Sequence, residues 1–155
     1  MGVKFGRYHV FLHRLIKPEA VSLRTLLWKN FQQKNFNLKP PTFGLNFLED
    51  SNFKNKNFML LCGFEKFDNY FVRIDILERL FMKIMNLRNE NEKGIKLIPE
   101  MLNLLGCSKE NFLKLIKKMN YYTYTKNDEA FFKYTPIKNN KKQFSSKVLK
   151  KENPF

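Results

Sequence analysis

The pattern of apolar and polar positions is clearest in the second half of the chain, where it predicts three helices in succession. The first covers residues 74–86, with apolar side chains three and four positions apart. Pro99 begins a short second helix that Gly106 ends as a left-handed cap. Ser108 caps a third helix over 109–119. One face of this third helix carries Phe112, Leu115, Ile116 and Met119.

Strand signals flank these helices. Residues 70–73 and 95–98 are predicted to be short extended segments. Residues 121–125 and 130–135 are predicted to be the two arms of a hairpin around a polar turn. Helix, short helix, glycine-containing turn, helix and hairpin is the order of a winged helix-turn-helix. We therefore expect an α+β fold, with a winged helix-turn-helix-like domain over residues 61–137.

The N-terminal 31 residues predict a basic β-hairpin followed by a helix. Strands over 3–5 and 8–12 flank the turn dipeptide Gly6-Arg7, and Pro18 stands at the first turn of the helix. An apolar stripe follows along that helix, made of Ala20, Leu23, Leu26, Leu27 and Phe31.

Two further segments have a composition that does not favour a packed core. Residues 32–60 are rich in Asn and Lys with scattered Phe, and we expect them to form a loosely packed connection. Residues 138–155 are rich in Lys, Asn and Ser, and we expect a disordered basic tail.

The charge of the chain points to a polyanionic partner. Lys and Arg number 29 against 14 acidic residues, which gives a formal net charge of +15. Residues 1–41 hold eight bases and one acid, and residues 136–155 hold six bases and one acid, whereas residues 42–135 are nearly balanced. Codon bias in an A/T-rich genome would also enrich Lys and Asn, but it would not remove Asp and Glu. The excess of bases over acids therefore favours nucleic acid as a partner.

The candidate nucleic-acid contacts lie off the apolar face of the predicted helix over 109–119 and on the basic segments around it. They are Lys109, Asn111, Lys114, Lys117 and Lys118 on the helix, Lys126 and Lys133 on the predicted wing, and Lys4, Arg7 and Arg14 on the N-terminal arm. The second helix of a helix-turn-helix docks on a duplex, where Lys contacts phosphates. This helix has no Arg, which argues against close reading of bases. The alternative is an ordinary solvated helix face, or a winged helix that docks on protein.

Aromatic and basic residues also alternate near the N-terminus. Phe5, Tyr8 and Phe11 are mixed there with the basic residues Lys4, Arg7 and Arg14. Such a mixture suits stacking on single-stranded nucleic acid together with phosphate contact. Packing in a core is the alternative role of these aromatic side chains.

No catalytic or metal-binding motif accompanies these features. The chain has no GxxxxGK[ST] loop, no DExx box and no nucleophile elbow. His9 and His13 are expected on one side of a strand without further ligands nearby. Asp75 and Glu78 suit a helix N-terminus, or ion pairs with Arg73 or Arg79, better than acid catalysis. We expect neither enzyme activity nor a bound metal.

The cysteines and the absence of long apolar runs indicate the cellular compartment of the protein. Cys62 and Cys107 form no CxxC pair and suit a reducing compartment as buried small hydrophobes. No signal-peptide pattern and no stretch of about eighteen apolar residues is visible. We therefore expect a cytoplasmic protein without a membrane partner.

Several ordered blocks of the sequence carry a family resemblance. They are 2–12, 15–18, 23–28, Gly63-Phe64, 72–80, 99–108 and the closing Asn153-Pro154-Phe155. These blocks resemble the segment after the motor in alphaproteobacterial ATP-dependent helicases, superfamily 2 enzymes akin to the mitochondrial RNA-degradosome helicase. The resemblance covers most of the chain and is weakest over 32–57. The two RecA-like motor domains of that family are absent.

The resemblance implies a C-terminal accessory region of an ATP-dependent RNA or DNA helicase. In that role the chain would contact phosphates or brace the motor, and ATP and Mg would belong to the missing motor domains rather than to this chain. Two alternatives remain open: a free-standing winged-helix DNA-binding protein, and a basic ribosome-associated protein.

Overall fold

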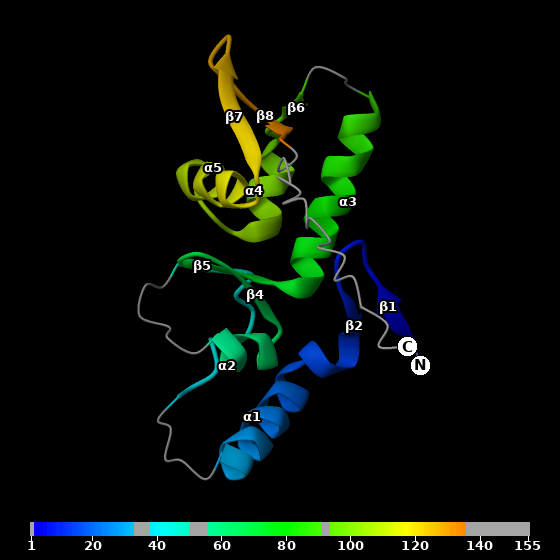
Figure 1. Cartoon of the computed structure of the whole chain (residues 1–155), viewed down its shortest axis with the longest axis vertical. Coiled ribbons are helices and arrows are strands. Elements are labelled where there is room, and N and C mark those ends of the chain that lie inside the picture. Colours follow the sequence, from blue (N-terminus) through cyan, green and yellow to red (C-terminus); the bar gives the residue numbers. More distant parts are fainter. Residues whose placement is uncertain (1, 33–37, 50–55, 91–93, 136–155) are drawn as a thin grey trace, which may run out of the picture.

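The computed structural model describes residues 2–32, 38–49, 56–90 and 94–135, and these form a mixed α+β fold (Figure 1). The predicted α+β class is confirmed. The predicted tail over 138–155 lies outside the described residues, and the division of the chain into domains stays a prediction. Within the described residues, no helix combines the length and the apolar character that crossing a bilayer requires.

The second half of the chain forms three helices and a three-stranded sheet at the top of Figure 1. In chain order these are α3 (Ile74–Glu90), β6 (Ile95–Lys96), α4 (Pro99–Leu105), α5 (Lys109–Lys118), β7 (Tyr121–Lys126) and β8 (Glu129–Tyr134). The sheet is antiparallel with the strand order β6-β8-β7. The predicted helices and the predicted hairpin are confirmed, with ends that differ by a few residues.

Local signals explain the boundaries of these elements. Gly106 ends α4 with a φ of 69°, a left-handed conformation that costs glycine little, and its N–H donates to the Leu102 carbonyl at 2.8 Å. The Ser108 hydroxyl accepts from the Asn111 N–H at 3.2 Å and caps α5. Asn127 and Asp128 both have positive φ and form the two-residue turn between β7 and β8.

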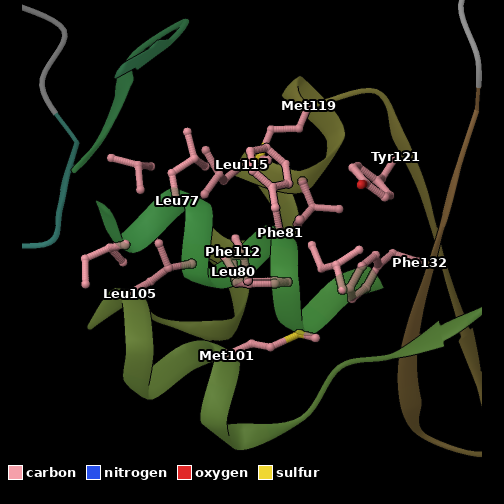
Figure 2. Packing of buried hydrophobic residues seen from close by; sticks show 14 of the residues in the cluster. Leu77, Leu80, Phe81, Met101, Leu105, Phe112, Leu115, Met119, Tyr121 and Phe132 are labelled. Atoms are coloured by element: carbon pink, nitrogen blue, oxygen red, sulfur yellow. The ribbon is translucent and has the colours of Figure 1, made fainter. Parts of the chain in front are cut away.

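The apolar face of α3 packs against α4, α5 and β8 to form the main core (Figure 2). Its members include large side chains with no exposed surface: Leu77, Leu80, Met101, Phe112, Leu115, Ile116 and Phe132. Burying each such side chain contributes about 1.5–3 kcal/mol to folding. This core fixes α4 and α5 relative to α3, and it leaves the opposite face of α5 in solvent.

A second sheet lies below this core and contains elements that the sequence pattern did not predict. It is antiparallel with the order β3-β5-β4, formed by β3 (Phe47–Glu49), β4 (Phe64–Phe67) and β5 (Tyr70–Arg73). The helix α2 (Lys56–Leu61) precedes β4, and its Phe58 and Met59 are fully buried. The connection expected over 32–60 thus contributes a paired strand and most of a helix. The pairing of Phe47 with Val72 joins distant residues, so no local period reveals it.

The N-terminal hairpin of β1 (Val3–Phe5) and β2 (Val10–Leu12) lies beside α3 (Figure 1). The strand predicted over 8–12 is too long, and the turn spans Gly6–His9 instead of two residues. The N–H of Gly6 donates to the His9 carbonyl at 2.8 Å across this turn. The physical reason for the wider turn is a contact with α3, described below. His13 begins the short 3-10 helix η1 (His13–Ile16), so its expected place in a strand with His9 is wrong.

The helix α1 (Pro18–Gln32) forms as predicted, but its predicted apolar stripe faces solvent. Leu23, Leu26 and Leu27 are each more than half exposed, and Phe31 is 82% exposed. A different face, with Val21 and Thr25, is buried. On the partly buried side, the Trp28 ring lies 5.5 Å from the Phe58 ring of α2, and Trp28 packs against the second group of buried side chains.

Candidate nucleic-acid interface

Three of the predicted contact residues form an exposed basic row on α5. Lys109, Lys114 and Lys117 are exposed, and the buried side of the same helix carries Phe112 and Leu115. None of the three lysines forms an ion pair with another described residue. These ammonium groups are therefore available to a phosphate.

The two other predicted residues of α5 are already engaged within the chain. The Asn111 amide donates to the Glu49 carboxylate at 3.2 Å. The Lys118 ammonium lies 2.6 Å from the Asp68 carboxylate, and this contact lowers the pKa of Asp68 and raises the pKa of Lys118. Both partners belong to the second sheet or its turn. Asn111 and Lys118, near the two ends of α5, thus connect this helix to that sheet. Because exposed ion pairs are weak, a phosphate can still compete for Lys118.

The β7–β8 hairpin carries less unpaired positive charge than its sequence suggests. Lys126 and Lys133 are exposed on β7 and β8, as predicted for the wing. Lys126 stands opposite Glu129 in the antiparallel register, and the Glu129 carboxylate forms an ion pair with Lys96 of β6. Lys133 stands opposite Tyr122. Of these two lysines, Lys133 is therefore the one without a carboxylate directly opposite it in the strand pair.

Glu78 of α3 holds the turn of the N-terminal hairpin. Its carboxylate accepts backbone N–H groups of Arg7 at 2.6 Å, Tyr8 at 3.0 Å and His9 at 2.9 Å. The His9 ring contacts it at 2.7 Å through Nδ1. A Cβ on Gly6 would lie 2.3 Å from the Glu78 carboxyl carbon, so any larger residue at position 6 would displace this carboxylate. Successive backbone N–H groups that converge in this way form an anion-binding nest.

These contacts correct one expectation and confirm another. Burial alone would raise the pKa of Glu78, but the hydrogen bonds from His9, Arg7 and Tyr8 outweigh it and lower that pKa. Glu78 therefore serves as the anion of the nest, and its expected pairing with Arg73 or Arg79 is wrong. Asp75 does pair with Arg73, through two hydrogen bonds of 2.6 and 3.1 Å.

A groove of about 740 Å³ lies between the docked hairpin and α3. The predicted residues Lys4 and Arg7 line it from the hairpin. Arg79 and Lys83 line it from α3, one helical turn apart, and sequence reasoning did not select them. Their i, i+4 spacing is a visible signal, but it is also the ordinary pattern of a solvated helix face. The predicted Arg14 is exposed on η1 and does not line this groove.

The described residues contain no group of three metal-ligating side chains that could hold an ion. The two cysteines are free thiols. Burial raises the pKa of both Cys62 and Cys107 to about 11, with Arg24 partly opposing the effect at Cys62. Both thiols are therefore neutral at physiological pH and poorly nucleophilic.

Comparison with known proteins finds no relative of this chain. No family model, no curated protein and no solved structure matches the chain. The resemblance to helicase accessory regions stays a prediction, and the functional inference depends on the residues described above.

Proposed function

We propose that this chain is a nucleic-acid-binding accessory module and that residues 74–134 form its winged-helix unit. The succession of α3, β6, α4, α5, β7 and β8 supports the second part, since the short β6 pairs with β8 to give the order β6-β8-β7. The left-handed Gly106 between α4 and α5 supports the tight corner of a helix-turn-helix.

The observation that carries the nucleic-acid part is the unpaired basic row of α5. Lys109, Lys114 and Lys117 are exposed on the second helix of the pair, in the position where such a helix docks on a duplex. Lys133 on β8 adds a cation on the wing. Because these side chains are Lys and not Arg, they suit phosphate contact that tolerates any base sequence.

The wider role that we propose is the accessory region of an ATP-dependent RNA or DNA helicase. The sequence blocks that resemble this family support it. In this role ATP hydrolysis, with its Mg, belongs to motor domains on another part of the assembly, and the present chain holds or guides the strand.

A second role, bracing a partner protein, is favoured by a separate observation. The outward face of α1 carries Leu23, Leu26, Leu27 and Phe31, all more than half exposed. Contiguous exposed apolar side chains of this kind mark protein-interaction surfaces. The helicase motor is the partner that we propose for this face.

Replacement of the α5 lysines tests the proposed function. We expect a triple variant, Lys109→Ala with Lys114→Ala and Lys117→Ala, to bind duplex at least about tenfold more weakly. The slope of log affinity against log salt should fall in magnitude by about 2.7, because each lost phosphate contact removes about 0.9.

The matched control replaces three exposed lysines outside α5, namely Lys17, Lys39 and Lys56. This control changes the net charge equally, so it should lower duplex affinity much less. Equal losses in both triple variants would show that only net charge matters and would overturn a specific role for α5.

A further inference from the structure

The groove between the hairpin and α3 is separate from the α5 surface. None of its lining residues belongs to α5 or to the β7–β8 hairpin. Its walls come mainly from the hairpin and α3, with His13 of η1 and Leu104 of α4 at its edges, and the Glu78 contacts hold the hairpin turn against α3. The groove therefore has a defined shape in the isolated chain.

The side chains that line the groove carry more positive than negative charge. Lys4, Arg7, Arg79 and Lys83 line it, and none of them forms an ion pair with another described residue. Two carboxylates also line it, but both are satisfied by other groups. Arg73 holds Asp75 through two hydrogen bonds, and the backbone nest with His9 holds Glu78. The four cations are thus left for an anionic ligand.

An aromatic ring stands among these cations. The Phe5 side chain lines the groove and is 81% exposed, which is unusual for a residue of this size. Phe11 and the half-exposed Met82 extend the apolar surface. Exposed rings flanked by Lys and Arg are the combination that single-strand binding surfaces use, since bases stack on the ring while phosphates meet the cations.

We propose that this groove binds single-stranded nucleic acid, with a base stacked on Phe5 and phosphates held by Lys4, Arg79 and Lys83. A duplex hides the faces of its bases within the stack, so it cannot use Phe5 in this way. The inference rests on the proposed nucleic-acid function and adds a second, strand-selective site to it.

The test measures binding of the full chain to a labelled oligothymidine and to a duplex of equal length. We expect Phe5→Ala to weaken single-strand binding by about tenfold, as loss of one stacked base does, and to leave duplex binding unchanged. Arg79→Gln with Lys83→Gln should weaken single-strand binding and reduce the magnitude of the salt slope by about 1.4. The single variant Arg79→Lys should retain affinity, because it keeps the charge.

A matched control pair, Lys39→Gln with Lys56→Gln, removes the same charge from exposed residues outside the groove and should leave single-strand affinity nearly unchanged. Circular dichroism checks the fold of each variant. If groove variants bind single strands like the wild type while the α5 triple variant loses binding, the groove proposal is wrong and the proposed function stands. If the wild type binds neither oligonucleotide at low salt, both fail.

Discussion

Glu78 decides where the N-terminal hairpin lies. Its carboxylate receives the N–H groups of Arg7, Tyr8 and His9, and the Tyr8 ring packs on Phe81 with centroids 4.3 Å apart. Hydrogen bonds to an ionised acceptor are stronger than neutral ones. A single side chain of α3 thus positions the hairpin wall of the groove.

Replacing Glu78 with Gln tests this role. The amide keeps the size of the side chain but loses the charge, and its NH2 group faces three N–H donors. We expect the variant to lose about 1–3 kcal/mol of unfolding free energy. Chemical denaturation measures this loss. Glu65→Gln is the control, because Glu65 reaches the hairpin through a 3.5 Å contact with His9 and should cost much less. Equal losses in the two variants would contradict the account.

Acid should release the hairpin as well. The pKa of Glu78 lies below its ordinary value of 4.5, so ionised Glu78 stabilises the folded chain at any pH above that value. This stabilisation disappears as the pH falls through the lowered pKa and the carboxyl takes up a proton. NMR of the Arg7, Tyr8 and His9 amide protons should show a cooperative shift below pH 4.5. Shifts that stay constant through this acid range would argue against docking by Glu78.

At the scale of elements, α1 buries one of its faces in the folded chain, but its more apolar face is exposed. Val21 and Thr25 are buried, and Val21 packs with residues of α2 and the second sheet, whereas the stronger apolar stripe faces solvent. A helix whose more apolar side is outward has a surface suited to a partner. The exposed stripe therefore contributes little to the stability of the isolated chain.

The double variant Leu26→Gln with Leu27→Gln tests this. Both side chains are more than half exposed, so the unfolding free energy should change by no more than about 0.5 kcal/mol per site. Val21→Ala, on the buried side, should lose about 1–2 kcal/mol. Thermal and denaturant unfolding measure both. A loss of more than about 2 kcal/mol in the double variant would mean that the stripe is covered in the folded chain.

Some elements could be predicted from the sequence better than others, because their signals are local. The helices α4 and α5 carry their own start and stop signals in Pro99, Gly106 and Ser108, so local sequence was sufficient. The strand β3 is three residues long and pairs with β5 across a long stretch of chain, so it left no local signal. Lys4 and Arg7 were predicted as contacts, but the groove they form with Arg79 depends on hairpin docking, which only the tertiary structure reveals.

At the scale of the whole molecule, basic side chains gather in two places. The row of Lys109, Lys114 and Lys117 lies on α5, and a second group lines the groove beside α3. The hairpin and α5 lie on different parts of α3 and its core (Figure 1). If both proposals hold, a chain with a net charge of +15 and these two surfaces would hold a duplex and a single strand at once. Such an arrangement would suit the proposed accessory region at a strand junction.

The salt dependence of nucleic-acid binding tests the central claim most directly. Fluorescence anisotropy of labelled single-stranded and duplex oligonucleotides, titrated with the full chain at increasing salt, gives the slope of log affinity against log salt. If about five phosphates are contacted, the slope should be about −3.5 on single strands and about −4.5 on duplex, with little dependence on base sequence. No measurable binding at low salt, or an affinity that does not change with salt, would contradict the account.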